Sequence, residues 1–352
     1  MIQQADSLSG QSPGASPSAP FGERFGVAFV GSGSARLQTV LSNDQLAAVV
    51  ETSDEWIATR TGIRQRHIAS PADSIRSMGG EAAKSAIAQA NLAPTDIDLI
   101  LLATSTPDDL FGSACQIQAE IGATRSVAFD ITAACSGFVF ALVTAAQFIR
   151  TGTYRNVVVI GADILSRLTD WGDRRTCVLF GDGAGAIVMQ RKVGGDRLLS
   201  FEMHSDGTSN SDLNAAYHHE PERLTDDITV QKGHFSPVTM NGREVYRFAV
   251  NRVPEVIEKS IFHAGLTNDD IDWLILHQAN QRILDAAAKR LGIPPEKVVS
   301  NMAKHGNTDA ASIPIALDEW IRAGKITAGD TLALSGFGAG LSWGAAILKW
   351  GH

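Results

Sequence analysis

Short apolar runs alternate with longer amphipathic stretches along most of the chain. Runs such as Leu99–Leu102 and Leu274–Leu276 are typical of buried strands. Helical periodicity recurs at two places: Phe138, Leu142, Ala145 and Ile149, and then Leu284, Ala287, Ala288 and Leu291. Because strands and helices alternate, we expect an α/β protein whose sheets are largely buried between helical layers.

Three stretches depart from this alternation. Thr52-Ser53-Asp54-Glu55 has the spacing of a capping box, which predicts a helix that starts here and carries Trp56. Residues 205–237 are polar and lack clear periodicity, so we expect a long loop. Residues 1–25 are rich in Ser, Pro, Gly and Gln, which predicts a disordered N-terminal tail.

The chain also contains an internal repeat of three ordered segments. Each half has a D-I-D motif before an apolar strand, then an I-R-x-G segment, then a Gly-rich turn leading into a strand. These segments lie at residues 96–98, 149–152 and 180–188, and again at 270–272, 321–324 and 337–348. Because the order is kept and the offset is nearly constant for the first two pairs, a duplication explains the matches better than chance does.

The duplication places chemically useful residues at matched positions. Alignment of the I-R-x-G segments makes Asn307 the counterpart of Cys135, and the D-I-D strands make His277 the counterpart of Ala103. If the halves pack about a pseudo-twofold axis, the thiol, imidazole and amide meet in one pocket. We therefore divide the chain into a tail, a half with the cysteine and a half with the histidine and asparagine: residues 1–25, 26–195 and 196–352.

Cys135 by itself allows two interpretations. It lies where an apolar strand-like stretch runs into a long apolar helix, among small residues. In the first turn of a helix, the positive end of the macrodipole favours the thiolate, which suits a nucleophile. The alternative is a buried apolar cysteine of the core. Spacing alone does not decide between the two.

Composition narrows the class of protein. The 352 residues are 44% hydrophobic, which suits an enzyme with a large core, and the net charge of −8 argues against a nucleic-acid partner. The three cysteines (Cys115, Cys135, Cys177) include no C-x-x-C pair, which disfavours disulfide and zinc scaffolds and indicates a reducing compartment. No apolar run approaches the roughly 18 residues that span a bilayer, and no leader pattern precedes the domain. We expect a cytoplasmic protein that makes no membrane contact.

Five motifs together resemble one known family. They are T-S-D-E-W-I-x-x-R-T-G-I-R from Thr52, A-A-C-S-G-F around Cys135, F-G-D-G-A-G-A from Phe180, H-Q-A-N-Q-R-I from His277 and G-N-T-x-A-A-S from Gly306. Between about Val27 and Trp350 the chain resembles the thiolase-fold condensing enzymes, most closely the β-ketoacyl-acyl-carrier-protein synthase III family. The resemblance implies a five-layered αβαβα fold of two duplicated halves related by a pseudo-twofold axis, and a homodimer.

The resemblance also implies the initiating condensation of type II fatty-acid synthesis. Cys135 would take the acyl group of a short acyl-coenzyme A, acetyl-CoA above all. Malonyl-acyl-carrier protein would then lose CO2, and His277 and Asn307 would stabilise its enolate by hydrogen bonds. The backbone N–H groups of Cys135 and Ala339 would hold the tetrahedral oxyanion. Coenzyme A thioester is a substrate here, so neither a cofactor nor a metal is expected.

Matched family positions imply the substrate contacts. Trp56 and Arg174 would sandwich the adenine of coenzyme A, and Thr52, Arg60 and Asn280 would make further contacts. A basic patch would attract the acidic carrier protein, and consists of Arg247, Arg282, Lys289 and Arg290. Each of these residues can instead be an ordinary surface or capping residue.

Two departures from the family pattern affect these expectations. The usual G-G-G after Phe337 reads G-A-G, and a positive φ at Ala339 would suit alanine badly. Leu110 or Phe111 stands where the family inserts an aromatic side chain into the acyl pocket of the partner subunit. The length of the starter acyl chain therefore stays open.

Other functions compete with the condensing enzyme. A same-fold enzyme of secondary metabolism, with another acyl donor or acceptor, would carry the same three residues. A Cys-His-Asn thioester hydrolase of the papain type is more distant, because the order of elements and the duplication do not fit it. The G-S-G-S-A-R segment from Gly31 lacks the third glycine of a dinucleotide loop, which argues against NAD.

Overall fold

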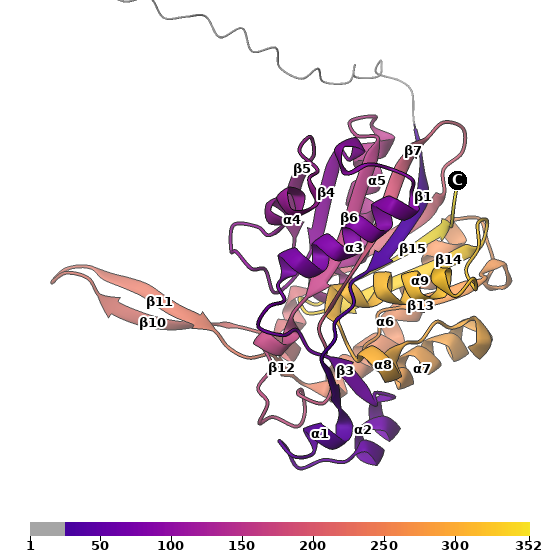
Figure 1. Cartoon of the computed structure of the whole chain (residues 1–352). Helices are drawn as coiled ribbons and strands as arrows, with labels where there is room; N and C mark the ends of the chain where they lie inside the picture. The colour runs from indigo at the N-terminus through magenta and orange to yellow at the C-terminus, as the bar shows by residue number, and fades with distance from the viewer. Residues whose placement is uncertain (1–24) are drawn as a thin grey trace, which may run out of the picture.

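Two mixed sheets form the body of the computed structural model, which describes residues 25–352 (Figure 1). The first has the order β1-β7-β6-β4-β5 and the second the order β13-β14-β15-β8. Strands of the first sheet are β1 (Gly26–Ser34), β4 (Leu99–Ala103), β5 (Val127–Ile131), β6 (Asn156–Asp163) and β7 (Gly183–Lys192). Strands of the second are β8 (Leu198–Ser205), β13 (Trp273–Leu276), β14 (Thr331–Gly338) and β15 (Ser342–Lys349).

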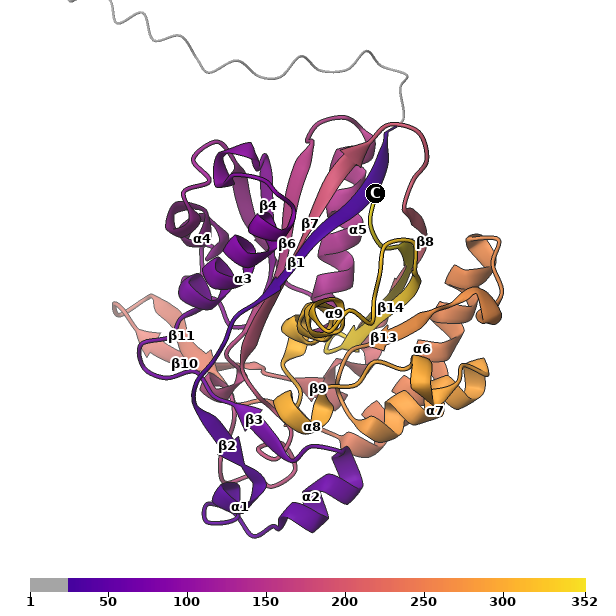
Figure 2. The same ribbon diagram turned by 45° about the vertical axis from the view of Figure 1, so that its right-hand side comes forward.

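Helices flank and separate the two sheets, which gives five layers. The long helices are α3 (Ile75–Gln89), α4 (Ala114–Ile121), α5 (Gly137–Arg150), α6 (Gly242–His263), α7 (Gln281–Leu291) and α9 (Ser312–Arg322). Helix α3 packs on the first sheet with α4 beside it, α6 packs on the second sheet with α7 beside it, and α5 and α9 contact both sheets. Figure 2 views α9 nearly end-on between the sheets. The predicted α/β class and five-layered αβαβα fold are confirmed.

The composition of the central helix explains its layer. Helix α5 is apolar around most of its circumference, and nine of its residues are buried, from Gly137 to Ile149. A helix that is apolar all round is stable only when it is covered on both sides. It packs against β4 and β6 on one side and against β14 and β15 on the other.

The D-I-D repeat has one structural role in both halves. In each motif the first carboxylate accepts the backbone N–H three residues upstream, at 2.8 Å in both halves. The second carboxylate accepts the N–H of the first residue of the neighbouring parallel strand, β6 or β14, at 2.9 and 2.8 Å. His277 directly follows β13 as Ala103 ends β4, so their predicted correspondence is confirmed.

The predicted correspondence of Cys135 and Asn307 is wrong by three residues. Helix α5 has 14 residues and α9 has 11. When the two helices are aligned at their C-terminal ends, their first residues therefore do not match. Before these starts, the 3₁₀ turn η2 (Ala134–Ser136) matches the turn η7 (Asp309–Ala311). The structural counterpart of Cys135 is therefore Ala310, and Asn307 lies just upstream of the turn.

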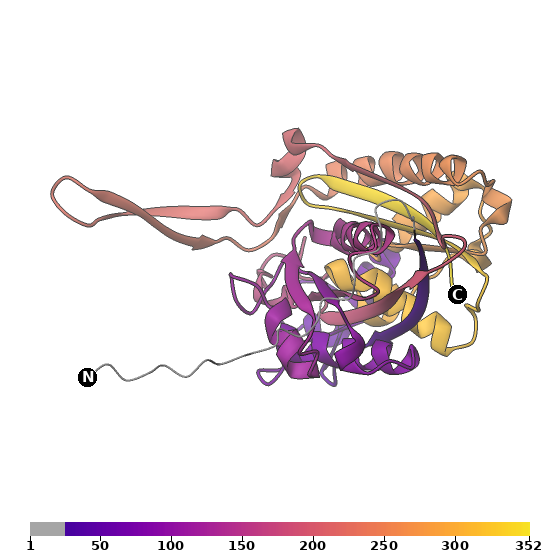
Figure 3. The ribbon, with the colours of Figure 1, turned by 90° about the horizontal axis from the view of Figure 1, so that it is seen from above.

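Residues 205–237 are more regular than the predicted loop. They contain the 3₁₀ turn η4 (Gly207–Asp212), the short strand β9 (Leu213–Asn214) and a hairpin of β10 (Tyr217–Arg223) and β11 (Thr229–Phe235). The hairpin extends away from the body of the molecule (Figure 3). Every residue of β10 is exposed, so no alternation of buried and exposed positions marks it in the sequence.

The predicted helix near Trp56 is present, with a different cap. Helix α2 (Asp54–Thr61) begins after Ser53, whose hydroxyl accepts the Trp56 N–H at 3.1 Å. Thr52 is therefore one position too early to be the cap. The remaining small elements around it are β2 (Val40–Ser42), α1 (Asn43–Leu46), β3 (Gln65–His67), β12 (Thr239–Met240) and α8 (Met302–His305).

Two predictions about chain organisation stay predictions. The tail at residues 1–25 lies outside the described residues except for Phe25. The boundary between residues 195 and 196 falls between β7 and β8, and we keep it as a proposal. Within residues 25–352, every helix is too short or too polar to cross a membrane.

Candidate active site

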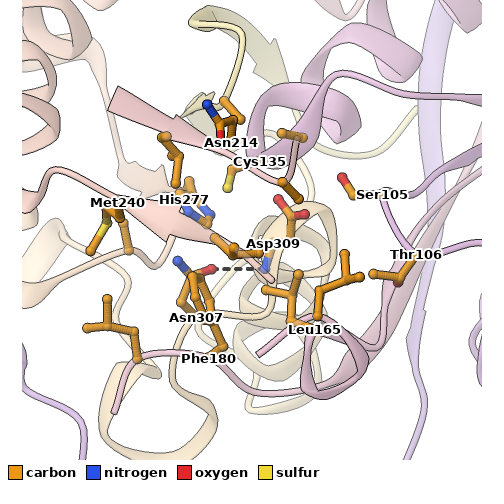
Figure 4. Close-up of a pocket in the computed structure, with 18 of the residues that line it drawn as sticks. Ser105, Thr106, Cys135, Leu165, Phe180, Asn214, Met240, His277, Asn307 and Asp309 are labelled. Atoms are coloured by element: carbon orange, nitrogen blue, oxygen red, sulfur yellow. Dashed lines mark hydrogen bonds between the residues drawn. The ribbon is translucent and has the colours of Figure 1, made fainter. Parts of the chain in front are cut away.

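A cavity of about 1510 Å³ is lined by residues of both halves (Figure 4). It brings together the three residues that the motifs singled out, because the side chains of Cys135, His277 and Asn307 all line it. Cys135 is only 9% exposed, yet it faces this cavity. A thiol that lines a cavity next to an imidazole and an amide is not an ordinary core cysteine.

Glycines of β14 position the thiol. A Cβ added at Gly336 would lie 2.8 Å from the Cys135 carbonyl oxygen, and one at Gly338 would lie 3.0 Å from its Sγ. Contacts this short leave no room for any side chain, so the turn η2 rests directly on the strand. The G-F-G sequence of β14 thus sets how far Cys135 enters the cavity.

His277 is held as a neutral hydrogen-bond donor. Its Nδ1 lies 2.7 Å from the Ser312 hydroxyl, which also receives the Gln278 N–H at 3.4 Å. We assign the ring proton to Nε2, with the Ser312 hydroxyl donating to Nδ1; Nε2 is buried and has no partner within the described residues. Burial lowers the pKa of His277 to about 3, so the imidazole is uncharged at neutral pH.

Asn307 is oriented by its own backbone neighbourhood. Its N–H and C=O pair with Leu179 and Gly181, both at 2.9 Å, which fixes the main chain beside the cavity. Its Oδ1 accepts the Asp309 N–H at 3.0 Å (Figure 4). Because a backbone N–H donates to the amide oxygen and not to the amide nitrogen, Oδ1 points towards Asp309. Nδ2 therefore points into the cavity, where it can donate a hydrogen bond.

The environment of Cys135 opposes the thiolate that the helix-start argument predicted. Burial raises the pKa of the thiol well above its ordinary value, and the nearby carboxyls of Asp309 and Asp163 raise it further. Burial and these carboxyls therefore favour the protonated thiol, whereas the N-terminal end of α5 favours the thiolate.

Ala339 also lines the cavity, and it directly follows Gly338, which packs against Cys135. Positive φ among the described non-glycine residues is confined to Asn91, Ala134 and Asp309. Alanine at 339 is therefore compatible with the local backbone, and the departure from G-G-G carries no strain there.

Comparison with known proteins assigns the chain to a family. The family model described as "3-Oxoacyl-[acyl-carrier-protein (ACP)] synthase III" matches residues 129–207, and its C-terminal counterpart matches residues 261–350. The beta-ketoacyl-[acyl-carrier-protein] synthase III of Trichormus variabilis is 63% identical over 330 residues, which are 94% of this chain and 100% of the relative. The chain belongs to the β-ketoacyl-[acyl-carrier-protein] synthase III family.

Solved structures agree with this assignment. The 3-oxoacyl-[acyl-carrier-protein] synthase III of Aquifex aeolicus VF5 is 44% identical with a TM-score of 0.84, over 92% of this chain and 100% of that one. The priming β-ketosynthase of the R1128 polyketide pathway is 34% identical with a TM-score of 0.86, over 95% and 99%. The family predicted from the motifs is confirmed, and the chain is a condensing acyltransferase of this type.

Three of the five positions matched to coenzyme A contacts line the cavity, namely Trp56, Arg60 and Asn280. The Arg60 and Arg174 guanidinium carbons lie 4.4 and 5.1 Å from the centre of a Trp56 ring. Asn280 also caps α7, because its Oδ1 accepts the Arg282 N–H at 2.9 Å. Thr52 lies outside the lining, and its buried hydroxyl has no partner within residues 25–352.

Of the basic positions matched to the carrier-protein patch, one lines the cavity and two are paired with carboxylates. Arg282 lines the cavity and stacks 5.3 Å from the centre of the Tyr246 ring. Arg247 pairs with Glu244 and Arg290 with Glu258, so part of their charge is balanced locally. Arg282, Lys289 and Arg290 all lie on α7, and Arg247 lies on the adjacent α6.

Sequence reasoning missed several residues of the cavity. Arg243, one turn before Arg247 on α6, lines it, as does Arg175. The i, i+4 spacing puts Arg243 on the same helix face as Arg247, so the sequence contained a signal that could have singled Arg243 out. Asp309 stands at the unspecified position of the G-N-T-x-A-A-S motif, so the motif gave no reason to single it out. Within residues 25–352 no cluster of three or more His, Cys, Asp or Glu side chains could hold a metal ion.

We expect Ser312→Ala to change the tautomer of His277. Without the hydroxyl, Nδ1 loses the donor that keeps it deprotonated, so the ring proton can occupy either nitrogen. The ¹⁵N NMR spectrum of labelled His277 should show protonated Nε2 in the wild type between about pH 5 and pH 8, and a mixture in the variant. A wild-type ring that is protonated on Nδ1, or that becomes charged near pH 6, would contradict the assignment.

Proposed function

We propose that the chain transfers the acyl group of a short acyl-CoA, acetyl-CoA above all, to Cys135 and condenses it with malonyl-acyl-carrier protein. The products are 3-ketoacyl-acyl-carrier protein, coenzyme A and CO2. The observation that carries the proposal is the convergence of the Cys135 thiol, His277 Nε2 and Asn307 Nδ2 on one cavity in a member of this family. The three cysteines are free, which suits the cytoplasm.

In the first half-reaction Cys135 is the nucleophile. Its Sγ attacks the thioester carbonyl, coenzyme A leaves, and the acyl group stays on the enzyme. The backbone N–H groups of Cys135 and Ala339 hold the oxyanion of the tetrahedral intermediate. This role requires only a main-chain donor at 339, so alanine serves as well as glycine.

In the second half-reaction two neutral donors stabilise a negative charge. Loss of CO2 from the malonyl group leaves a thioester enolate, whose oxygen accepts hydrogen bonds from His277 Nε2 and Asn307 Nδ2. An imidazole with a pKa of about 3 cannot protonate the enolate carbon at neutral pH, so the carbanion survives to attack the acyl-Cys135. Hydrogen bonds supply the electron sink, so the chemistry needs neither a cofactor nor a metal.

Coenzyme A binding requires a rearrangement of Arg174. A flat adenine between Trp56 and Arg174 needs two stacking distances of about 3.5 Å each, which exceed the 5.1 Å between the guanidinium and the ring. Arg174 donates to the Glu51 carbonyl at 2.9 Å, and loss of that exposed bond costs little. Thr52, Arg60 and Asn280 complete the proposed contacts.

The carrier protein docks, in this proposal, over the junction of α6 and α7. Arg282 and Arg243 line the cavity there, and Arg247, Lys289 and Arg290 extend the positive charge along the two helices. An enzyme of net charge −8 needs such a local patch to attract an acidic protein.

A second candidate differs in substrate and keeps the same chemistry. The similarity to the R1128 priming β-ketosynthase favours a condensing enzyme of secondary metabolism with another acyl donor. The identity of 34% there, against 63% to the Trichormus variabilis synthase, favours the fatty-acid reaction. Rates of Cys135 acylation by acyl-CoAs of increasing length decide between these donors.

The acylation step predicts a specific mass change. Incubation with acetyl-CoA should add one acetyl group to Cys135, as measured by intact-protein and peptide mass spectrometry, because only this thiol has the oxyanion donors beside it. Cys135→Ser should abolish labelling, whereas Cys177→Ser, a buried cysteine outside the cavity, should leave it unchanged. Acetyl mass on Cys115, which also lines the cavity, would contradict the assignment.

The two donors should be needed only after acylation. His277→Ala and Asn307→Ala should still be acetylated on Cys135, and each should lose about 10²–10³-fold in the formation of acetoacetyl-carrier protein. The surface variant His263→Ala is the matched control and should condense normally. Loss of acetylation as severe as the loss of condensation would refute this division of roles.

We also propose a homodimer formed at β5. This strand is an edge of its sheet, and Val127 and Phe129 on it are exposed, as are Leu110 and Phe111 nearby at 80% and 97%. The family resemblance has Leu110 or Phe111 of a second copy enter the acyl pocket. Sedimentation should give twice the 37.4 kDa mass of the chain. Val127→Lys should weaken the dimer, and Val193→Lys should not, because Val193 is an exposed valine away from β5.

A further inference from the structure

Asp309 is a buried carboxyl beside the thiol, with no role in the mechanism so far. It is 4% exposed and lines the cavity. Figure 4 shows its carboxylate between Cys135 and Ser105. Its Oδ1 has no hydrogen-bond partner within the described residues. A desolvated carboxylate oxygen without a partner is costly, which indicates a function that needs it.

The local backbone does not require this carboxyl. Asp309 has a left-handed φ of 51°, and its counterpart in the duplicated turn, Ala134, has a φ of 45°. Alanine thus supports the same conformation in the first half, so the turn alone does not explain an aspartate in the second. What distinguishes the two positions is the thiol that the Asp309 side chain faces.

Three titratable groups lie near Cys135, and two of them are not placed to accept its proton. Asp163 does not line the cavity, and its carboxylate oxygens already accept hydrogen bonds from the Ser105 and Ala310 N–H groups and from two threonine hydroxyls, while burial and the neighbouring Asp309 raise its pKa. His277 presents its protonated Nε2 to the cavity, while its Nδ1 is occupied by Ser312. Asp309 is the group with a free acceptor atom, and burial raises its pKa above the ordinary value.

We propose that Asp309 accepts the thiol proton of Cys135 during acylation and returns it to the departing coenzyme A thiolate. The inference rests on the proposed function. The Sγ–H bond breaks, its proton passes to the Asp309 carboxylate, and Sγ forms the bond to the acyl carbon. The bond from that carbon to the coenzyme A sulfur then breaks, and the sulfur takes the proton from Asp309. The products are acyl-Cys135, neutral coenzyme A thiol and the regenerated carboxylate.

Charge conservation favours this route over loss of the proton to water. Transfer from Sγ to Asp309 leaves the buried pair with one negative charge before and after the step. Loss to water would leave a thiolate and a carboxylate side by side in a desolvated site, which like-charge repulsion opposes. The raised pKa of the thiol expresses the same repulsion.

The Asp309→Asn variant distinguishes a proton acceptor from a residue that acts on the thiol only through its negative charge. Asparagine has the same size and tolerates left-handed φ, so the turn is kept while the base is removed. The single-turnover rate of Cys135 acetylation by acetyl-CoA should fall by about 10²-fold or more. The pKa of Cys135, from the pH dependence of its alkylation by iodoacetamide, should decrease because a neighbouring negative charge is gone. If Asp309 only repels the thiolate, acetylation and alkylation at neutral pH both become faster.

Asp309→Gly supplies the second arm, because glycine adopts this φ freely and leaves space beside the thiol. It should show the same loss, and added sodium formate should restore part of the acetylation rate. Acetylation of Asp309→Asn at or above the wild-type rate, or absence of rescue by formate in Asp309→Gly, would overturn the proposal. A wild-type enzyme that acetylates Cys135 separates such a failure from failure of the proposed function.

Discussion

Two close backbone contacts between the halves hold the candidate site together. A Cβ at Gly336 of β14 would lie 2.8 Å from the Cys135 carbonyl oxygen, and one at the matched Gly161 of β6 would lie 2.2 Å from the Ala310 carbonyl oxygen. Each turn therefore rests on the strand of the opposite half, where only glycine fits. Cys135 is placed by the second half, and the turn after Asn307 is placed by the first. The cavity is complete only when both halves pack.

The candidate catalytic side chains lie at matched positions where the duplicated halves differ in sequence. The scaffold provides equivalent positions at the strand ends and helix starts, and the side chains at those positions diverge. Ala103 corresponds to His277, Ala134 to Asp309 and Cys135 to Ala310. The first half thus contributes the thiol, and the second half contributes the imidazole and, in our proposal, the base. Burial acts on all of them: it keeps the imidazole neutral and the thiol protonated.

The sequence predicted those features that repeat or that bury an apolar face. Alternating strands and helices, the duplication and the meeting of Cys135, His277 and Asn307 all followed from pattern. The three-residue offset between Asn307 and the structural counterpart of Cys135 did not follow from pattern. Helix α9 is shorter than α5, but its helical periodicity is intact and so does not reveal the difference in length. The exposed β10–β11 hairpin buries no face, so it left no pattern. The state of the thiol depends on burial and on the carboxyls of Asp309 and Asp163, which are distant in sequence, and a local helix-start rule cannot include them.

Asp309 connects the two half-reactions of the proposed mechanism. Its backbone N–H holds the Asn307 Oδ1 at 3.0 Å, which turns Nδ2 towards the cavity, while its side chain faces the thiol. In the first step a negative charge is shared between the Asp309 carboxyl and sulfur. In the second step a further negative charge develops on the enolate oxygen, and the donors His277 and Asn307 are already aligned. One left-handed turn therefore orients the amide for condensation and supplies the carboxyl for acylation.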